Sequence, residues 1–392
     1  MKADAYGHGA VAVASWLECG GADGFCVATF DEGRLLRLAG IERPILILYP
    51  IPADLAPDAA NFRLAVTVAD ETLFERTCAA IESTRTALPP VPSLELHLEV
   101  ETGLGRGGIA VAEVGRVVDR IRSLPGVVLG GIWSHLAAPA DRGRTAAASA
   151  RFDAATAALA ALGGVMPARH LAATGAVLVG SVPLHDRVRL GLGLYGLTPD
   201  RLELAGAWRA VGEALAPVMS IHARPVRVLE LPAGHGVSYG PSFVTERPSR
   251  IATLPLGYGD GWPRILSGRS WALVRGRRVP LVGTVAMDAL MADVTDVPGL
   301  PVTVDDEFVL LGRQAGPGAG SAAAEIAVAD LALARTTISW EVVAQMAQRM
   351  TRVYHAAAVA VGVRTLTEEI YLWSPASSSG TGISATWRST RS

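Results

Sequence analysis

The sequence predicts an α/β chain that forms a TIM (β/α)8 barrel followed by a mainly antiparallel β domain. From Ala10 to about Gly196, short β-rich runs alternate with longer helical patterns, which is typical of a parallel sheet. Seven such runs, together with one expected to end at Lys2, make the eight strands that close a TIM barrel. From about Ala207, short strands are separated by Gly, Pro and Asp turns, which favours a compact antiparallel domain.

The elements of the first region follow from their hydrophobic periodicity and turn residues. We expect strands at residues 25–30, 45–49, 64–68, 94–100, 129–134, 170–173 and 188–190. We expect helices at residues 10–19, 31–38, 71–84, 111–123 and 144–162. A doubly wound open sheet is the alternative fold, but no GxGxxG fingerprint follows the first strand.

The first barrel strand is largely missing, because only Met1 precedes Lys2. A strand needs several residues to pair, so one residue cannot form it. Either the start codon is misassigned or the barrel is open at one seam. An open parallel edge exposes unpaired backbone groups, so we favour an N-terminally truncated barrel.

The region from about Ala207 onward sets the boundary between the two predicted domains. We expect strands at residues 218–231, 250–255, 271–275, 279–282, 290–294 and 307–311, and helices at 322–334 and 339–350. After about His355 the pattern is lost, and residues 374–392 are rich in Ser, Thr and Gly. The prediction is a cofactor-binding barrel at 1–206, a β-rich domain at 207–355 and a disordered tail at 356–392.

Composition excludes several classes of function. The formal net charge of −2 shows no basic excess, so no nucleic-acid partner is indicated. Three cysteines, Cys19, Cys26 and Cys78, make an odd count without a CxxC pair, which fits a reduced cytoplasm. Neither a signal peptide nor a membrane span is indicated. The eight histidines have no HExxH spacing, so we expect no metal site.

Lys2 is the only lysine among 392 residues, and every other basic position apart from histidine is arginine. A desolvated lysine can lose its proton and attack an aldehyde, whereas arginine stays protonated. Drift toward arginine that left one lysine by chance is the alternative. The glycines and small residues that follow indicate a tight turn before a helix that begins near Ala10.

Residues 2–9, KADAYGHG, resemble the cofactor-lysine motif of bacterial alanine racemases, which are fold-type III pyridoxal phosphate enzymes. Further motifs match that family in order as far as about Tyr354. The resemblance implies pyridoxal 5'-phosphate as cofactor and Lys2 as both its covalent anchor and one catalytic base. It also places Tyr6 beside the cofactor.

Residues 99–108 resemble the family's Lys-x-Asp-Thr-Gly-Met-x-Arg-x-Gly loop. By this match Arg106 donates to the phenolic oxygen of the cofactor and contacts substrate. Many members have a lysine that becomes carbamylated where this chain has Glu99, which can offer the same charge to Arg106. A glycine-rich loop with surface charge pairs is the structural alternative.

Later motifs imply the remaining cofactor contacts. Ser-His at 134–135 resembles a pair that places His135 beside the cofactor ring. Thr174, Gly191 and Leu192 match the phosphate site, and Arg189 matches the arginine that hydrogen-bonds the ring nitrogen. Alone, His135 could be a buried structural histidine and Arg189 a salt-bridge partner at the barrel mouth.

Racemisation needs a second base on the opposite face of the carbanion. Residues 237–240 resemble the family's VSYG motif, whose tyrosine is that base, so Tyr239 is the expected residue. Residues 257–264 and 285–288 resemble segments in which Tyr258 lines the entrance and the Met287 amide meets the substrate carboxylate. The family places the second domain against its partner's barrel, which implies a homodimer with shared active sites.

Two departures concern phosphate binding, because Ala173 replaces an asparagine and Trp340 replaces a tyrosine whose hydroxyl reaches the phosphate. The resemblance implies a cytoplasmic enzyme that interconverts L- and D-alanine and supplies D-alanine for peptidoglycan. Alternatives are a racemase for serine or another amino acid, and a catalytically silent or truncated paralogue.

Overall fold

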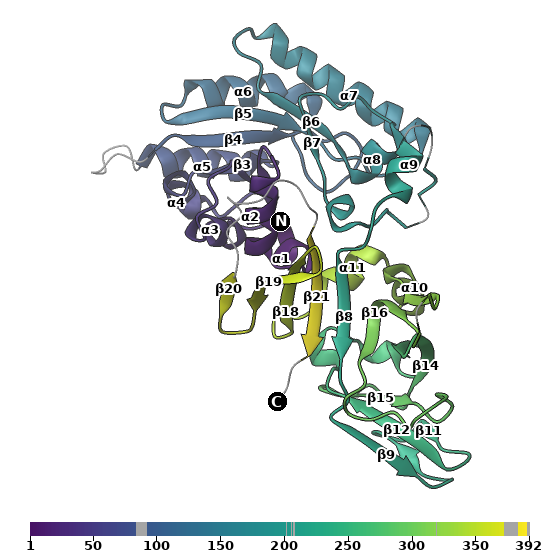
Figure 1. The fold of residues 1–392 in the computed structure, drawn as a ribbon. Helices are drawn as coiled ribbons and strands as arrows, with labels where there is room; N and C mark the ends of the chain where they lie inside the picture. Colours follow the sequence, from purple (N-terminus) through teal and green to yellow (C-terminus); the bar gives the residue numbers. More distant parts are fainter. Residues whose placement is uncertain are drawn as a thin grey trace. The chain divides into compact units, whose positions relative to one another are not determined.

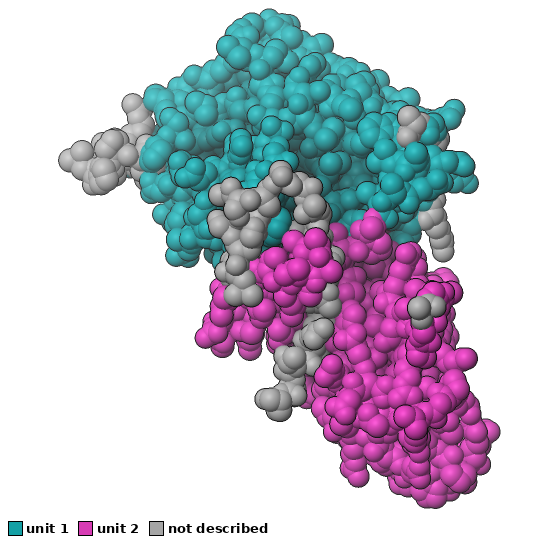
Figure 2. All heavy atoms as spheres, viewed as in Figure 1, with its two compact units in different colours: residues 1–5, 10–215 teal, residues 6–9, 216–392 magenta. Residues whose placement is uncertain are grey.

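The computed structural model describes residues 1–83, 92–200, 202–204, 206, 208–318, 320–371 and 383–389, with backbone alone at 371 and 383–389. It divides into two compact units (Figure 2). Unit 1 contains residues 1–5 and 10–215, and unit 2 contains residues 6–9 and 216–392. The motif at residues 2–9 therefore crosses the division between the units.

Unit 1 is built on a parallel sheet whose seven strands follow one another in chain order (Figure 1). They are β1 (Phe25–Val27), β2 (Ile45–Ile47), β3 (Leu64–Val68), β4 (Leu94–Glu99), β5 (Val127–Trp133), β6 (Ala168–Ala173) and β7 (Arg187–Arg189). All five residues of β3 are buried, as expected for a parallel strand covered on both faces. The sheet is a nearly closed barrel, which confirms the predicted TIM-type fold.

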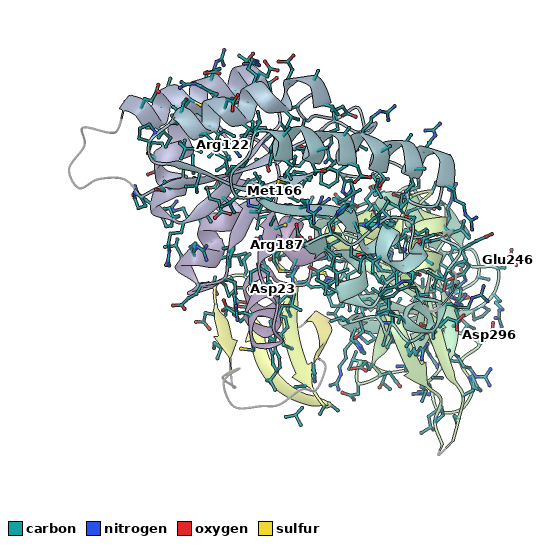
Figure 3. All side chains as sticks on the ribbon, turned by 90° about the horizontal axis from the view of Figure 1, so that it is seen from above. Asp23, Arg122, Met166, Arg187, Glu246 and Asp296 are labelled. Carbon is teal, nitrogen blue, oxygen red and sulfur yellow. The ribbon has the colours of Figure 1, made fainter. Side chains whose placement is uncertain are left out.

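Helices follow most of these strands. They are α2 (Ala10–Cys19), α3 (Phe30–Leu38), α4 (Ala56–Asn61), α5 (Glu71–Ser83), α6 (Val114–Ser123), α7 (Arg142–Ala161), α8 (Thr174–Val179) and α9 (Trp208–Glu213), with 3-10 turns η1 (Ala53–Leu55), η2 (Val111–Glu113) and η3 (Leu192–Tyr195). Thr29 and Glu32 form a capping box that begins α3. Arg122 on α6 donates to the Gly163 carbonyl beyond α7 at 2.7 Å, which ties these outer helices together (Figure 3).

No strand ends at Lys2, as expected from the largely missing first barrel strand. Residues 3–6 have φ values of 52 to 55°, so α1 (Lys2–Tyr6) is a left-handed turn. Left-handed geometry costs about 1–2 kcal/mol per residue outside glycine, so other contacts must hold the turn. Ala3 donates its N–H to Glu32 Oε1 at 2.6 Å, and the Met1 amino group donates to the Cys26 carbonyl at 2.7 Å. The predicted helix at residue 10 is confirmed.

Unit 2 contains a large, mainly antiparallel sheet, which confirms the predicted class of the second domain. Its strands include β8 (Met219–Ala223), β9 (Arg227–Leu231), β12 (Ser249–Leu254), β13 (Trp271–Val274), β14 (Arg277–Val282), β15 (Leu290–Asp293), β16 (Phe308–Ala315) and β17 (Ala323–Ile326). A separate hairpin joins β10 (Gly236–Val237) to β11 (Phe243–Val244). Val237 from this hairpin packs with Ile251 and Val282 in a small core.

The segment predicted as a disordered tail contains strands, so that prediction is wrong for its described residues. They are β19 (Val359–Arg364), β20 (Glu369–Tyr371) and β21 (Ile383–Ser389), and they follow β18 (Thr351–Ala356), which lies almost entirely in the predicted β-rich domain. β18 pairs antiparallel with both β19 and β21, and β21 runs parallel to β8. The prediction rested on the Ser, Thr and Gly content of the tail. It overlooked the valines that alternate along β19, which is the period-2 pattern of a strand. The remainder of residues 374–392 lies outside the described residues.

The helices of unit 2 are shorter than expected. They are α10 (Val328–Ala334) and α11 (Ser339–Ala344), with 3-10 turns η4 (Tyr258–Asp260) and η5 (Arg264–Leu266). The front of the helix predicted at 322–334 is instead β17, which pairs with β16. Across the described part of the chain, no helix has both the length and the hydropathy needed to cross a bilayer.

Candidate active site

The polar residues that the motifs single out in unit 1 lie at the carboxyl ends of its parallel strands. Glu99 is the last residue of β4, and Ser134 and His135 follow β5 directly. Thr174 follows β6, and Arg189 ends β7. Because parallel strands end on one side of a barrel, this side gathers the groups into one site.

Lys2 lies in a cationic environment. Its pKa is lowered from the ordinary lysine value, first by burial and then by the nearby charge of Arg106. Glu32 opposes this effect and favours the charged amine. A lysine with a lowered pKa presents more neutral amine at neutral pH than an ordinary lysine does.

Arg106 pairs with Glu99 in the same site. The Arg106 Nη2 atom lies 3.6 Å from Glu99 Oε1, and the guanidinium stacks on the Tyr49 ring at 5.2 Å. Glu99 is 4% exposed, and burial raises the pKa of its carboxyl, while Arg106 counteracts that rise. The carboxylate thus lies where the sequence comparison expects an anionic partner for Arg106.

Arg189 is held by the ends of β5 and β6. Its Nη2 donates to the Ser134 carbonyl at 2.6 Å and to His135 Nδ1 at 3.4 Å. Its Nη1 donates to both Nδ1 and the carbonyl oxygen of His170 at 2.8 Å. The guanidinium also covers the Trp133 ring at 4.8 Å. These hydrogen bonds come from the two terminal nitrogens, so Nε keeps its N–H for another acceptor.

A chain of hydrogen bonds runs from Arg189 through two histidines to a glutamate. Arginine only donates, so His170 Nδ1 must accept, and its Nε2–H donates to His97 Nδ1 at 3.2 Å. His97 Nε2–H then donates to Glu95 Oε1 at 2.9 Å. This direction fixes the neutral tautomer of both histidines. The pKa of His170 is far below its ordinary value, through burial and then the charge of Arg189.

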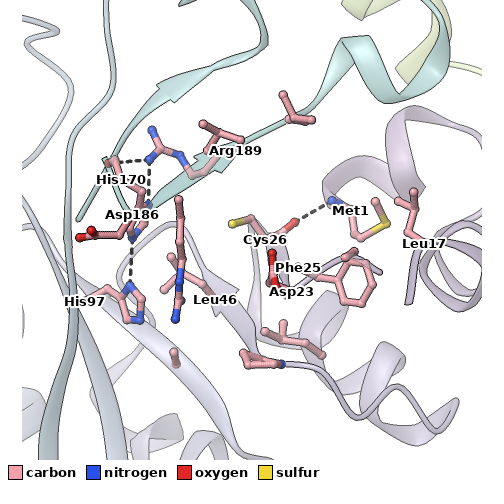
Figure 4. A pocket seen from close by; sticks show the side chains of 18 of the residues that line it. Met1, Leu17, Asp23, Phe25, Cys26, Leu46, His97, His170, Asp186 and Arg189 are labelled. Carbon is pink, nitrogen blue, oxygen red and sulfur yellow. Dashed lines mark hydrogen bonds between the residues drawn. The ribbon is translucent and has the colours of Figure 1, made fainter. Parts of the chain in front are cut away.

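A cavity of about 660 Å³ borders this relay, and its lining comes from both edge strands of the sheet (Figure 4). Cys26 on β1 and Arg187 on β7 line it, together with His97, His170 and Arg189. Most of the predicted site residues of unit 1 do not line it. A smaller cavity of about 290 Å³ borders His135 instead.

His135 is neutral in this site. Burial, followed by the charges of Arg189, Arg106 and Lys2, lowers the pKa of His135 to about 3. Three basic side chains therefore lie near this imidazole. The neutral ring can accept the hydrogen bond from Arg189, which a protonated ring could not.

The loop after β7 is held by the threonine after β6. Thr174 Oγ1 accepts from the Gly191 N–H at 2.9 Å and from the Gly193 N–H at 3.4 Å. A Cβ at Gly193 would lie 2.9 Å from Thr174 Cγ2, so the close approach requires glycine. Thr174, Gly191 and Leu192 thus lie in neighbouring segments.

Tyr239 belongs to unit 2 and is 76% exposed. Ser238, before it, has φ of 67°, and its hydroxyl donates to the Thr284 carbonyl at 2.6 Å. Gly283 packs closely, because a Cβ there would lie 2.6 Å from the Val237 carbonyl oxygen. These contacts fix the backbone at Tyr239 and leave its phenol in solvent.

Tyr258 and Met287 lie on two loops that pair through their backbones. Tyr258 N–H donates to the Ala286 carbonyl at 3.0 Å, and Gly259 N–H donates to the Met287 carbonyl at 2.9 Å. Tyr258 is 41% exposed and Met287 52% exposed. The structure therefore brings these two predicted substrate contacts together.

Tyr6 and Trp340 are also assigned to unit 2. The segment at residues 6–9 is fixed by Arg352, which is fully buried and donates to the Gly7 carbonyl from Nε at 3.2 Å and Nη2 at 3.1 Å. Gly7 must be glycine, since a Cβ would lie 2.2 Å from the Val343 carbonyl oxygen. Trp340 lies on α11 and is partly buried.

Several residues that organise these sites were not singled out by the motifs. Glu95, His97 and His170 form the relay, and Arg349 and Arg352 hold loops of unit 2. One signal was present, because Glu95, His97 and Glu99 alternate along a predicted strand and so face the same side. The partner residues are far apart in sequence, and no local pattern joins them.

Comparison with known proteins identifies the family of both units. The model described as "Alanine racemase, N-terminal domain" matches residues 1–199, and "Alanine racemase, C-terminal domain" matches residues 218–354. The chain is 40% identical over 357 residues to an alanine racemase from Symbiobacterium thermophilum, covering 90% of this chain and 89% of the relative. An alanine racemase from Desulfosudis oleivorans is 37% identical over 373 residues, with 90% and 88% covered.

Solved structures agree with this assignment. Alanine racemase from Bacillus anthracis with bound L-Ala-P has a TM-score of 0.82 at 28% identity, covering 93% of this chain and 90% of that one. Alanine racemase from D-cycloserine-producing Streptomyces lavendulae has a TM-score of 0.74 at 32% identity, with 89% and 87% covered. The chain is an isomerase, and by these two domains in this order it belongs to the alanine racemase family.

Proposed function

We propose that the enzyme interconverts L- and D-alanine with pyridoxal 5'-phosphate, and that Lys2 and Tyr239 are its two bases. The observation that carries this proposal is the environment of Lys2, the only lysine in the chain. Its pKa is lowered by burial and by Arg106, and it shares a site with Arg189 and a neutral His135. The names of the relatives supply alanine as the substrate.

The residues of unit 1 fit an anionic aromatic cofactor. Arg189 keeps its Nε–H for a ring nitrogen, because its terminal nitrogens already bind described residues. Arg106 would donate to the phenolic oxygen, and Glu99 balances its charge. The loop of Gly191 and Leu192, held by Thr174, would take the phosphate. When bound, pyridoxal phosphate supplies an aldehyde and an electron sink for the carbanion at the substrate's Cα.

Lys2 has two tasks in this scheme. Its amine would hold the cofactor covalently, and the same amine, once neutral, would accept or return the proton at the substrate's Cα. Both tasks need an unprotonated nitrogen, and the lowered pKa of Lys2 provides a larger fraction of it. An arginine at this position would do neither.

Arg189 controls how strongly the cofactor withdraws electrons. Burial lowers the pKa of Arg189 to about 10, which leaves the guanidinium charged at neutral pH. It would therefore donate a hydrogen bond to the ring nitrogen of a bound cofactor without transferring a proton. A ring nitrogen without a proton would be the poorer electron sink, which would favour proton exchange at Cα over other reactions.

Tyr239 would protonate the opposite face of Cα. A phenol has an ordinary pKa near 10, so it needs a desolvated site with cationic neighbours to act as a base. Tyr239 is 76% exposed within its own chain. We therefore propose a homodimer in which a second copy covers Tyr239 and each active site takes Lys2 from one subunit and Tyr239 from the other.

The cellular role that we propose is the supply of D-alanine for peptidoglycan in the cytoplasm. Purified protein mixed with pyridoxal phosphate and L-alanine should form D-alanine, with a visible absorption band from the bound cofactor. Lys2→Ala should lose both, while Arg247→Met, on the exposed surface of unit 2, should lose neither. A soluble wild-type protein without the band would refute the proposal. Faster turnover of serine than of alanine would make serine the proposed substrate.

The shared site has its own test. Lys2→Ala and Tyr239→Phe chains, each inactive in racemisation, are unfolded, mixed in equal amounts and refolded. Mixed dimers would contain one complete site of two, so about a quarter of wild-type activity should return. No recovered activity from a refolded mixture, with full recovery from refolded wild type, would place both bases in one chain.

A further inference from the structure

One arginine joins the two loops of unit 2 that carry Tyr258 and Met287. Arg349 Nε donates to Asp260 Oδ1 at 2.7 Å, and its Nη2 donates to Asp288 Oδ1 at 2.7 Å. The same Nη2 lies 3.4 Å from the Met287 carbonyl oxygen. A single guanidinium therefore binds one carboxylate from each loop, a geometry that a planar fork of donors permits and an ammonium does not.

Asp260 anchors the Tyr258 loop through its other contacts. It is 7% exposed, and its Oδ2 accepts from the Gly257 N–H at 2.9 Å. Its carbonyl accepts from the Ala347 N–H at 3.1 Å, which ties the loop to the chain segment that carries Arg349. Tyr258 is 41% and Met287 52% exposed, whereas the Asp260 carboxylate that Arg349 holds is buried.

Gly259 makes the arginine's position possible. A Cβ at this residue would lie 2.4 Å from Arg349 Nη2 and 3.1 Å from the Met287 carbonyl oxygen. The resembled family motif, Gly-Tyr-Ala-Asp-Gly-Tyr, has alanine at this place, whereas this chain has glycine. The methyl group that an alanine would add at position 259 and the guanidinium of Arg349 would compete for the same space. The residue at position 259 therefore decides whether Arg349 can lie where it does.

We propose that Arg349 is a positioning residue that sets the spacing between the Tyr258 side chain and the Met287 amide, and thereby the binding of the substrate carboxylate. The inference rests on the proposed function, in which the Met287 N–H meets that carboxylate. Without Arg349, Asp260 and Asp288 would lose the guanidinium that joins them. The two loops would then lose this tie near the backbone hydrogen bonds that join Tyr258 to Ala286 and Gly259 to Met287.

The test compares Arg349→Met with Arg247→Met in the cofactor-loaded enzyme. Arg247 contacts Asp296 at 2.6 Å on the exposed surface and controls for loss of an Arg–Asp pair. Arg349→Met should raise KM for L-alanine about ten-fold or more, because the substrate carboxylate would lose the equivalent of a charge-assisted hydrogen bond. The kcat should change much less. The inhibition constant of propionate, which is alanine without its amine, should rise by the same factor. Arg247→Met should change neither constant.

A double-mutant cycle separates positioning from general destabilisation. Gly259→Ala should reproduce the rise in KM, because its methyl group displaces Arg349. In the Arg349→Met background the same alanine should have little further effect. Additive effects, or unchanged KM and propionate inhibition in Arg349→Met, would overturn the inference while leaving the racemase intact. Absence of alanine turnover in the wild-type enzyme would remove the proposed function and this inference with it.

Discussion

Acidification should destabilise unit 1 through two histidines that the fold keeps neutral. His135 has its pKa lowered to about 3, and the pKa of His170 is far below its ordinary value, in both cases mainly through burial and then the charge of Arg189. In the unfolded chain both histidines return to an ordinary pKa of 6.5. The unfolded state therefore binds more protons in mild acid, and stability must fall as the pH drops below that value.

The magnitude follows from proton linkage. A histidine that stays neutral when folded costs about 1.4 kcal/mol of stability between about pH 7.5 and pH 5.5. Two such histidines give about 2.8 kcal/mol, a large fraction of the stability of an ordinary domain. His170 is 3% exposed and His135 partly buried, so solvent screening reduces this figure little.

Urea unfolding followed by circular dichroism at the two pH values measures this loss. His170→Gln keeps an amide oxygen that can accept from Arg189 and cannot titrate in this range, so about half of the pH dependence should vanish. Adding His135→Asn should remove most of the remainder. His235→Gln, a change at an exposed histidine of unit 2, is the control and should keep the full dependence. An undiminished loss in the His170→Gln and His135→Asn double variant would refute the argument.

Three further changes test the sites. Glu99→Gln removes the carboxylate that orients Arg106 toward the proposed phenolic oxygen, so pyridoxal phosphate should bind about ten-fold more weakly in an absorbance titration. Gly9→Ala would put a Cβ 2.0 Å from the Tyr354 hydroxyl at a φ of 95° and should lower the melting temperature. Gly40→Ala has a similar φ of 88° but no atom within 4 Å, so it should cost less. Trp340→Tyr should tighten cofactor binding about ten-fold if the phenol reaches the phosphate, which equilibrium dialysis would measure.

The parallel sheet was predictable because its strands are short, apolar and separated by amphipathic helices. The runs that begin at Phe25, Ile45 and Leu64 each became a strand at the predicted place. β3 has five buried residues, and a continuous apolar run of that length has few structural alternatives. The β19 strand was missed because composition was weighed above the alternation that begins at Val359.

The left-handed geometry of the turn after Lys2 could not be predicted, since it depends on distant residues. Alanine and aspartate rarely adopt left-handed geometry in succession, and no local propensity indicates it. The contacts that hold it come from Glu32 and Cys26, on α3 and β1. The glycines that follow were a usable signal, and Gly7 and Gly9 do lie where a side chain would collide with backbone or ring.

The site itself was predictable only where residues belong to motifs. Lys2, Arg106 and Arg189 could be named from local sequence, whereas the contact of His97 with His170 joins residues 73 apart and that of Arg349 with Asp260 residues 89 apart. Such pairs depend on which strands and loops the fold makes neighbours. Sequence reasoning therefore identified the groups that we propose contact reactants and missed the groups that hold them in place.

The charge balance of unit 1 explains why the site needs an anion. Lys2, Arg106 and Arg189 lower the pKa of His135, and Arg106 lowers that of Lys2, whereas Glu99 is the buried carboxylate that pairs with Arg106. Cations held this close repel one another, and burial strengthens the repulsion. A bound phosphorylated cofactor would offset it, so cofactor binding should raise the stability of the fold as well as equip it for catalysis. Arg106, which together with burial lowers the pKa of Lys2, would thus also help to attract the anionic molecule that we propose Lys2 binds.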